Sequence, residues 1–275
     1  MKAGQIKTSR LTNVVVIPVY KPKPAETEIR SLRQALTVLG THDIRLIGPE
    51  GLDLSAYEAV YKPFGRPVEA ETFDPSYFSS VAGYNKLMLS RCFYQRFASW
   101  DYLLIYQLDA WVFKDELDAW CAKGYDYIGA PWMKLNGRLD EKNSGNGGFS
   151  LRKIATFIEL FDHQGPIWGY KGLVCRYRYR GPLRRRQCIF RGLLGWKNKL
   201  SDFAEKGEEN EDLFFAALKH KKGKPFRIPP TCEAMYFSFE ESPAMLYERT
   251  GHTLPFGCHA WEKWEYETFW KQFIY

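Results

Sequence analysis

The chain has 275 residues, of which 45% are hydrophobic and 16% are aromatic, and its formal net charge is +7. This length and apolar content are enough for a full core, so we expect a single domain over residues 1–275. No apolar run approaches the roughly 20 residues that span a bilayer, and the polar start before a short apolar run is not the order of a secretory signal. We therefore expect a cytoplasmic protein.

The cysteines and the charges are distributed unevenly. Six cysteines are scattered without a CxxC pair, which fits neither a disulfide scaffold nor a structural zinc site. Ten Lys and Arg and no Asp or Glu lie between Lys171 and Lys199, so the rest of the chain carries a charge of −3. The basic character is therefore confined to an insert at about residues 171–199.

The first elements alternate between strand and helix patterns. The β-branched run NVVVIPV, residues 13–19, predicts a strand that is covered on both faces. The spacing of Ile29, Leu32, Leu36 and Leu39 predicts a helix that ends at Gly40. Residues 43–47 and 58–63 are predicted to be short strands.

The following segments continue this alternation. Asp74 or Ser76 is the candidate N-cap of one helix whose apolar residues continue to Phe97. Residues 102–108 form an apolar run typical of a buried strand, residues 115–122 are helix-like, and residues 125–131 are strand-like. This order predicts an α/β fold with a doubly wound, mostly parallel central sheet and helices on both faces.

Asp109 follows the apolar run YLLIYQL directly, at the end of a strand that is otherwise buried. Open α/β sheets bind ligands beyond the carboxyl ends of their strands, so this carboxylate is a candidate ligand for a cation. The alternative is that Asp109 caps the next turn or pairs with a nearby lysine. The residue alone does not separate these alternatives.

Three later motifs bear on this choice. SGNGGFSLR, residues 144–152, has glycines that permit close approach of a ligand but matches no nucleotide fingerprint. ENEDLFFAAL, residues 209–218, places acids at a helix start, where they also favour the helix dipole. PFGCHAWEKW, residues 255–264, contains His259, and a lone histidine is more often structural than a ligand.

In this order, the motifs resemble the common pattern of GT-A glycosyltransferases. That pattern has an acidic motif at a strand end, a glycine-rich loop, an acidic helix start and a C-terminal histidine. The segments VVVIPVYK, YNKLMLS, DYLLIYQLDAWVF, YDYIGAPW, GNGGFSLR, NEDLFF and PFGCHAW resemble, more closely, a bacterial family of GT-A-like domains of unknown function, DUF5672, from about Val14 to Trp264. One departure is Gln107, which stands where the first Asp of the acidic motif would be.

The resemblance implies a hexosyltransferase that uses a nucleotide-diphosphate-sugar donor, with a UDP-sugar expected. The acceptor would be a saccharide or a lipid-linked sugar, in cell-surface polysaccharide synthesis. Asp109 and His259 would hold Mn²⁺ or Mg²⁺, a cation that neutralises the growing charge of a diphosphate leaving group. Asp212 would be the general base of an inverting reaction, and Glu211 would contact acceptor hydroxyls or cap the helix.

The remaining site residues also come from the resemblance. Pro18, Val19 and Tyr20 would border the nucleotide base, Asn85 and Lys86 would contact the diphosphate or ribose, and Gln107 would lie beside Asp109 in the donor site. Gly147, Gly148 and Phe149 would form the acceptor side of the site.

Two alternatives to an active transferase are a catalytically inactive GT-A-like domain that binds a sugar or partner, and a basic nucleic-acid-binding protein. A nucleic-acid-binding protein would explain the basic segment RYRYRGPLRRR, but it would give the acidic motifs no role. We therefore expect that the protein does not bind nucleic acid. For the insert itself, one hypothesis is a solvated, mobile loop beside the acceptor. The other is a surface that contacts an anionic inner membrane face or an anionic acceptor.

Overall fold

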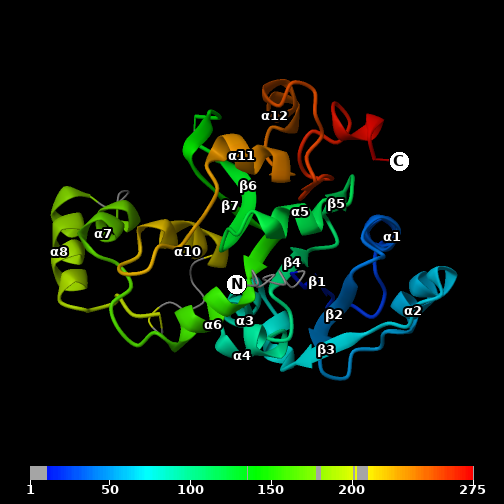
Figure 1. The fold of residues 1–275 in the computed structure, drawn as a ribbon, viewed down its shortest axis with the longest axis horizontal. Helices are drawn as coiled ribbons and strands as arrows, with labels where there is room; N and C mark the ends of the chain where they lie inside the picture. The colour runs from blue at the N-terminus through cyan, green and yellow to red at the C-terminus, as the bar shows by residue number, and fades with distance from the viewer. Residues whose placement is uncertain (1–10, 135, 178–180, 201, 203–209, 275) are drawn as a thin grey trace, which may run out of the picture.

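The computed structural model describes residues 11–134, 136–177, 181–200, 202 and 210–274. Its central sheet has six strands in the order β3-β2-β1-β4-β7-β6 (Figure 1). Their bounds are Asn13–Pro18 (β1), Asp43–Pro49 (β2), Ala70–Phe73 (β3), Tyr102–Tyr106 (β4), Tyr127–Met133 (β6) and Leu139–Lys153 (β7). In this sheet, β7 alone runs antiparallel to its neighbours, which confirms the mostly parallel prediction.

A second, three-stranded sheet has the order β5-β9-β8 and lies beyond the end of β4. Its strands are very short: Trp111–Val112 (β5), Ser238–Phe239 (β8) and Gly257–Cys258 (β9). β9 pairs antiparallel with β5 and parallel with β8. This sheet joins the segment after β4 to the C-terminal part of the chain.

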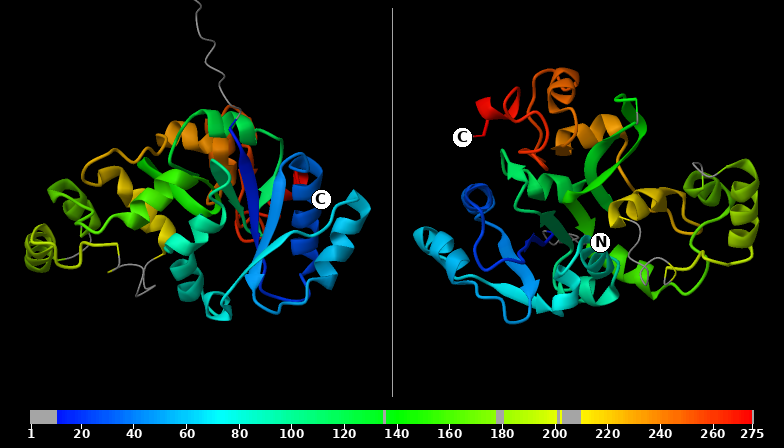
Figure 2. Two further views of the ribbon diagram at one scale, coloured as in Figure 1. Left: turned by 60° about the horizontal axis from the view of Figure 1, so that its bottom comes forward. Right: turned by 180° about the vertical axis from the view of Figure 1, so that it is seen from behind.

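Helices cover both faces of the central sheet, as Figure 2 shows from two further sides. They are α1 (Glu26–Val38), α2 (Ser55–Tyr61), α3 (Val81–Met88), α4 (Arg91–Arg96), α5 (Leu117–Ala122), α6 (Ile154–Asp162), α7 (Tyr170–Arg176), α8 (Pro182–Leu193), α10 (Glu211–Ala217), α11 (Thr231–Phe237) and α12 (Pro243–Arg249). Short 3₁₀ helices are η1 (Lys62–Phe64), η2 (Pro75–Phe78), η3 (Leu218–His220) and η4 (Trp270–Gln272). None of the described helices is long and apolar enough to cross a bilayer.

The two-sided burial of β1 explains its continuous apolar sequence. Val14 and Val16 pack into a cluster with residues of α3, α4, α6 and α10. Val15 and Ile17 point the other way, into a cluster with residues of α1, α2 and α5. Because side chains alternate along a strand, a strand buried on both faces needs apolar residues at every position. The prediction of a doubly wound sheet with helices on both faces is confirmed.

The strand predicted over residues 58–63 is wrong. This segment lies in α2 and η1, where Tyr57, Val60 and Tyr61 are buried. A spacing of three and four residues places these side chains on one helical face, and this packing overrides the β propensity of the short run.

The single helix predicted up to Phe97 is divided into three pieces. Asp74 caps η2, with its side chain accepting from Ser76 N, while Ser80 caps α3 and Ser90 caps α4. Each cap hydrogen bond satisfies backbone donors at a new helix start, which explains the interruptions.

Two other segments differ from the expected loops. The glycines of SGNGGFSLR lie within β7 and not in a loop before a strand. Most of the described part of the basic insert is helical and lies in α7 and α8. Residues 178–180 lie outside the described residues.

Candidate active site

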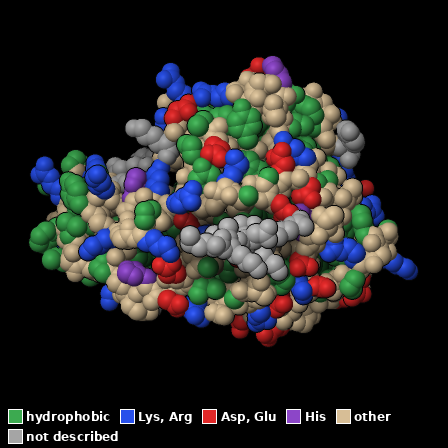
Figure 3. All heavy atoms as spheres, in the orientation of Figure 1, with side chains coloured by type: hydrophobic (Ala, Val, Ile, Leu, Met, Phe, Trp, Pro, Cys, Tyr) green, Lys and Arg blue, Asp and Glu red, His purple; other side chains and the backbone are tan. Residues whose placement is uncertain are grey.

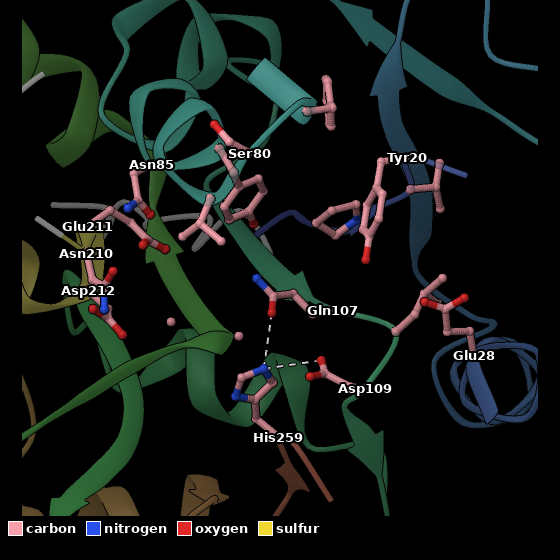
Figure 4. Close-up of a pocket in the computed structure, with 18 of the residues that line it drawn as sticks. Tyr20, Glu28, Ser80, Asn85, Gln107, Asp109, Asn210, Glu211, Asp212 and His259 are labelled. Carbon is pink, nitrogen blue, oxygen red and sulfur yellow. Dashed lines mark hydrogen bonds and ion pairs between the residues drawn. The ribbon is translucent and has the colours of Figure 1, made fainter. Parts of the chain in front are cut away.

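A cavity of about 780 Å³ lies at the carboxyl ends of β1 and β4. Its volume is that of a site for a substrate or cofactor. It is lined by Pro18, Val19, Tyr20, Lys21, Glu28, Tyr57, Phe78, Ser79, Ser80, Val81, Tyr84, Asn85, Gln107, Leu108, Asp109, Asn146, Gly147, Gly148, Asn210, Glu211, Asp212, His259 and Lys263. Figure 4 shows Tyr20 and Glu28 on one side, Gln107, Asp109 and His259 in the middle, and Asn85 and residues 210–212 on the other side.

The middle of the cavity is formed where β4 gives way to a turn. Ala110 N donates to Gln107 O at 2.9 Å, which closes the turn that contains Asp109. His259 is the residue that directly follows β9, and the pairing of β9 with β5 brings it to this turn. The Nε2 atom of His259 lies 3.1 Å from Gln107 Oε1 and 3.2 Å from Asp109 Oδ1.

Glu240 is the fourth polar side chain of this group, and nothing in the sequence singles it out. Parallel pairing aligns Ser238 with Gly257 and Phe239 with Cys258, so Glu240 follows β8 where His259 follows β9. Its Oε2 atom lies 3.4 Å from Nδ1 of His259, and neither atom has a hydrogen-bond partner among the described residues. The imidazole therefore lies between two carboxylates, one on each ring nitrogen.

The two carboxylates and the imidazole shift each other's protonation. Burial alone would lower the pKa of His259, but its contacts with Asp109 and Glu240 raise it to about 10. Burial would raise the pKa of Asp109, yet the hydrogen bond and charge of His259 hold it below its usual value. Asp109 is thus ionised at neutral pH.

Gly148 makes room for this imidazole. A Cβ atom at Gly148 would overlap the ring of His259, and a Cβ atom at Gly147 would come 2.8 Å from Glu211 Oε1. The glycines of β7 therefore allow the side chains of two other motifs to lie directly against the strand. The spacing of the motifs in the sequence contains no hint of this contact.

The other end of the cavity carries Glu211 and Asp212, both buried in the first turn of α10. Glu211 Oε1 lies 3.4 Å from Nη2 of Arg152, which is fully buried. The same guanidinium donates to Tyr94 Oη at 2.9 Å and to Ser150 Oγ at 3.2 Å. Arg152 therefore fixes Glu211 and supplies it with a positive charge.

Asp212 has no such cation among the residues that the structure describes. Its Oδ1 atom accepts from Leu213 N at 2.6 Å, as expected of an acid in a first helical turn. Burial, and the neighbouring charge of Glu211, nevertheless raise the pKa of Asp212 to about 7. A carboxyl with this pKa can accept a proton near neutral pH.

Most residues suggested by the sequence resemblance lie around this cavity. Pro18, Val19 and Tyr20 line one side, and Asn85, Gln107, Asp109, Gly147, Gly148, Glu211, Asp212 and His259 line the rest. Two suggested residues lie elsewhere. Lys86 is exposed on α3 outside the cavity, and Phe149 is buried against Tyr106, Phe237 and Phe256 in the core.

The cavity also contains polar residues that the sequence motifs did not indicate. Glu28 of α1 pairs with Lys21 at 3.1 Å. Lys263 lies in the motif that contains His259, but the motif assigned it no role. Neither Glu28 on a helix nor Lys263 in a loop has a distinctive local sequence pattern of its own. Their place in the cavity is therefore visible only in the folded chain.

The sequence model of one protein family, described as "Protein of unknown function (DUF5672)", matches residues 67–259. The chain belongs to the DUF5672 family. The matched segment of this DUF5672 protein includes Asp109, Glu211, Asp212 and Glu240, and it ends at His259. No curated protein matches the chain by sequence.

Solved structures resemble the DUF5672 chain at low sequence identity. A complex of galactosyltransferase LgtC with donor and acceptor sugar analogues is 13% identical, with 90% of this chain and 86% of that chain covered and a TM-score of 0.47. The apo form of mouse xyloside xylosyltransferase 1 is 10% identical, with 90% and 97% covered and a TM-score of 0.47. The Mn/GDP form of core-mannan synthase A from Aspergillus fumigatus is 8% identical, with 79% and 72% covered and a TM-score of 0.46.

Proposed function

We propose that this DUF5672 protein transfers a sugar from a nucleotide-diphosphate-sugar donor to a hydroxyl of an acceptor. One observation carries the proposal: a single cavity holds the Gln107, Asp109 and His259 group between an aromatic, acidic side and a pair of buried carboxylates (Figure 4). In a sugar transfer, the bond between the anomeric carbon of the sugar and the diphosphate oxygen breaks while the acceptor hydroxyl attacks the same carbon. A nucleotide side, a cation site for the diphosphate and an acceptor side with a base are therefore needed in this order.

The middle group fits a divalent cation once Nε2 of His259 has released its proton, because a metal-binding imidazole is neutral. Among the described residues, no three His, Cys, Asp or Glu side chains form a metal cluster. Asp109 and His259 would supply two donors, and the amide oxygen of Gln107, water and diphosphate oxygens would be available as the others. Gln107 Oε1 and Asp109 Oδ1 both lie near His259 Nε2, at 3.1 and 3.2 Å. Neighbouring ligands of an octahedral Mg²⁺ or Mn²⁺ are about 3 Å apart, which follows from bonds of about 2.1 Å. Glu240 would orient the imidazole through Nδ1, as carboxylates do behind many metal-bound histidines.

When bound there, Mn²⁺ or Mg²⁺ would neutralise the charge that grows on the diphosphate leaving group. The chain's own residues provide the rest of the donor site. The half-exposed ring of Tyr20 offers a face for the nucleobase, and the Glu28 carboxylate can accept hydrogen bonds from ribose hydroxyls. Lys263 adds a positive charge on the diphosphate side.

Asp212 is the proposed general base. Its raised pKa of about 7 lets it accept the proton of the acceptor hydroxyl as the new bond forms. Glu211, which is fixed by Arg152, would hold a second acceptor hydroxyl. A base on the acceptor side suits direct displacement with inversion at the sugar carbon. A UDP-sugar donor, a saccharide or lipid-linked acceptor of cell-surface polysaccharide synthesis, and a cytoplasmic location are part of this proposal.

A second candidate function is sugar-nucleotide binding without transfer. The observation that favours it is the neutral Gln107 at a position where a second carboxylate would strengthen cation binding. Both candidates predict donor binding, but only the transferase releases the sugar from its nucleotide. Donor turnover therefore separates the two.

The test is a thermal-shift panel of ADP, CDP, GDP and UDP, each with Mn²⁺ and with a chelator. We expect one base to stabilise the protein in Mn²⁺ only, by about 2.7 kcal/mol when the ligand is 100-fold above its Kd. The nucleotide sugars of that base are then assayed for release of the nucleoside diphosphate. Stabilisation without release would support the binding protein, and no stabilisation by any base would reject both functions.

A further inference from the structure

Helices α7 and α8 form a folded hairpin at the end of the molecule farthest from α1 and α2 (Figures 1 and 2). Asn198 fastens it, because its amide donates to Trp168 O and Gly192 O, each at 2.9 Å, and accepts from Trp168 N at 3.0 Å. Leu173 of α7 and Ile189 of α8 belong to the same buried cluster as Phe214 of α10. The outer face of α8 is therefore held in a fixed position.

This outer face is unusually apolar. Of the eleven exposed large hydrophobic side chains among the described residues, six lie between Tyr170 and Trp196. Leu183, Phe190 and Leu194 are 78%, 65% and 73% exposed. They are seven and four residues apart, so on a helix they form one stripe along the solvent side. Ile189 and Gly192 face the opposite way, into the protein.

Basic side chains border the stripe on both sides. At 100° per residue, Arg184 and Arg191 lie along one flank of the stripe and Arg186 along the other, and all three are exposed. Trp196 continues the surface beyond the helix, with Arg191 and Lys197 stacked on its ring at 5.0 and 4.6 Å. Figure 3 shows hydrophobic and basic side chains side by side at this end of the molecule. No Asp or Glu occurs between Lys171 and Lys199.

We propose that this α8 surface, formed by Leu183, Arg184, Arg186, Phe190, Arg191, Leu194 and Trp196, docks the protein on an anionic lipid bilayer. An exposed Leu and Phe stripe bordered by cations matches the boundary between acyl chains and anionic headgroups. The apolar side chains enter the boundary while the arginines extend to the phosphates. A protein partner with an acidic rim, or a second copy of the chain, would be the competing occupant. A second copy that docked through its own α8 surface would lack the charge complementarity, because that surface is also basic.

The hairpin also fixes how the cavity would face such a bilayer. α7 packs against α10, the helix that begins with Glu211 and Asp212. The Asp212 side of the cavity is therefore nearer to the α8 surface than the Tyr20 side, which borders α1. If the proposed function is correct, an acceptor carried on a membrane lipid would approach the carboxylate end. Docking itself does not depend on the proposed function.

The experiment is co-sedimentation of the full chain with two kinds of vesicle, phosphatidylcholine alone and phosphatidylcholine with roughly one third phosphatidylglycerol. A charge variant carries Arg184→Glu, Arg186→Glu and Arg191→Glu, and an apolar variant carries Leu183→Gln, Phe190→Gln and Leu194→Gln. A matched control carries Arg33→Glu, Lys62→Glu and Lys134→Glu, three exposed cations outside the α8 surface. Circular dichroism verifies that all variants fold.

We expect the parent chain and the control to bind the anionic vesicles only, and to be released as salt rises. The charge variant should partition at least about a hundredfold less, since each basic residue near the surface contributes a factor of about five and each introduced glutamate adds repulsion. The apolar variant should also lose binding. Failure of the parent to bind at low salt, or equal losses for the control and charge variant, would overturn the proposal. The proposal would also be overturned if the parent did not bind vesicles but formed a dimer in sedimentation velocity, and if only the apolar variant were monomeric. Vesicle binding without any nucleotide effect would retain the docking inference and reject only the proposed function.

Discussion

Asp109 and Asp212 are two aspartates of one cavity whose surroundings drive their pKa values in opposite directions. Asp109 is half-exposed and lies against a cationic imidazole, which holds its pKa below the usual range. Asp212 is buried beside another carboxylate, and its pKa rises to about 7. The first is therefore a permanent anion suited to a cation, and the second is a group that can exchange a proton at neutral pH.

The difference arises from where the nearest positive charge is directed. His259 faces Asp109, whereas the buried guanidinium of Arg152 faces Glu211, and no cation in the described part of the chain pairs with Asp212. Identical side chains thus acquire separate tasks through their partners. Each of the following predictions tests one side of this contrast.

The largest effect is expected for Asp212→Asn. Turnover should fall by roughly 10² to 10⁴, the contribution of a positioned base, while donor affinity stays the same. Initial rates of nucleotide release, with calorimetric donor binding on the same sample, measure both. Unchanged turnover would show that the base lies elsewhere. A loss of folding stability large enough to account for the lost turnover would favour a purely helix-capping role for Asp212.

Next is the loss of cation-dependent binding in Asp109→Asn and His259→Ala. Each variant removes one of the donors at the middle of the cavity, so we expect nucleotide diphosphate affinity in Mn²⁺ to drop by roughly a hundredfold. In chelator, parent and variants should bind equally weakly. Binding in Mn²⁺ at parental affinity would refute the assignment of these residues.

Gly148→Ala tests whether the position of the His259 ring matters for cation binding when the ring itself is retained. The added methyl group would overlap the imidazole, so the ring must move away from Asp109 although every cation donor is retained. Mn²⁺-dependent affinity should fall by roughly tenfold to a hundredfold. Gly169→Ala is the control, because nothing lies within 4 Å of a Cβ atom at that position. Parental affinity in Gly148→Ala would mean that the imidazole position does not matter.

Glu240→Gln tests the carboxylate behind His259. The amide preserves the shape of the side chain but removes its charge, and we expect roughly tenfold weaker Mn²⁺ binding with turnover at saturating Mn²⁺ nearly unchanged. Titration of Mn²⁺ against donor hydrolysis measures this shift. A fall in turnover that excess Mn²⁺ does not restore would assign Glu240 a different role.

The pH dependence follows from Asp212 and has opposite signs for activity and stability. Because the base acts when deprotonated, turnover should rise about tenfold per pH unit up to pH near 7 and then level off. A raised carboxyl pKa means that the folded state retains the proton, so this group stabilises the fold most below pH 4. That stabilisation is lost as the pH rises to about 7. Denaturant unfolding of the parent and Asp212→Asn should show a larger loss of stability in the parent between pH 4 and 7. The loss above pH 6.5 that comes from His259, whose pKa is raised to about 10, should be common to both proteins.

The sequence was most informative where burial and pattern coincide. β1 and β4 are buried on both faces, which agrees with the covered strands predicted from their β-branched and aromatic apolar runs, and α1 has an undivided apolar face. Asp109, Asp212 and His259 could be proposed because they lie in motifs whose order resembles a family. The strand prediction for residues 58–63 failed because the short apolar run Ala59–Tyr61 fits a strand or one helical face equally well, and packing decides.

Contacts between distant segments could not be predicted. Glu240 reaches His259 only because β8 and β9 pair in a particular register, and Arg152 reaches Glu211 across the core from β7. The close contact of Gly148 with His259 has the same origin. For α8, the sequence showed the basic and apolar composition, but the stripe exists only once the segment is helical.

Calorimetric titration of one nucleotide diphosphate into the parent, Asp109→Asn and Asp212→Asn, each with Mn²⁺ and with chelator, tests the division of tasks between the two aspartates most directly. The prediction is that Mn²⁺ strengthens binding in the parent and in Asp212→Asn to the same extent, and has no effect in Asp109→Asn. Equal strengthening by Mn²⁺ in all three proteins, or its loss in Asp212→Asn alone, would contradict the account.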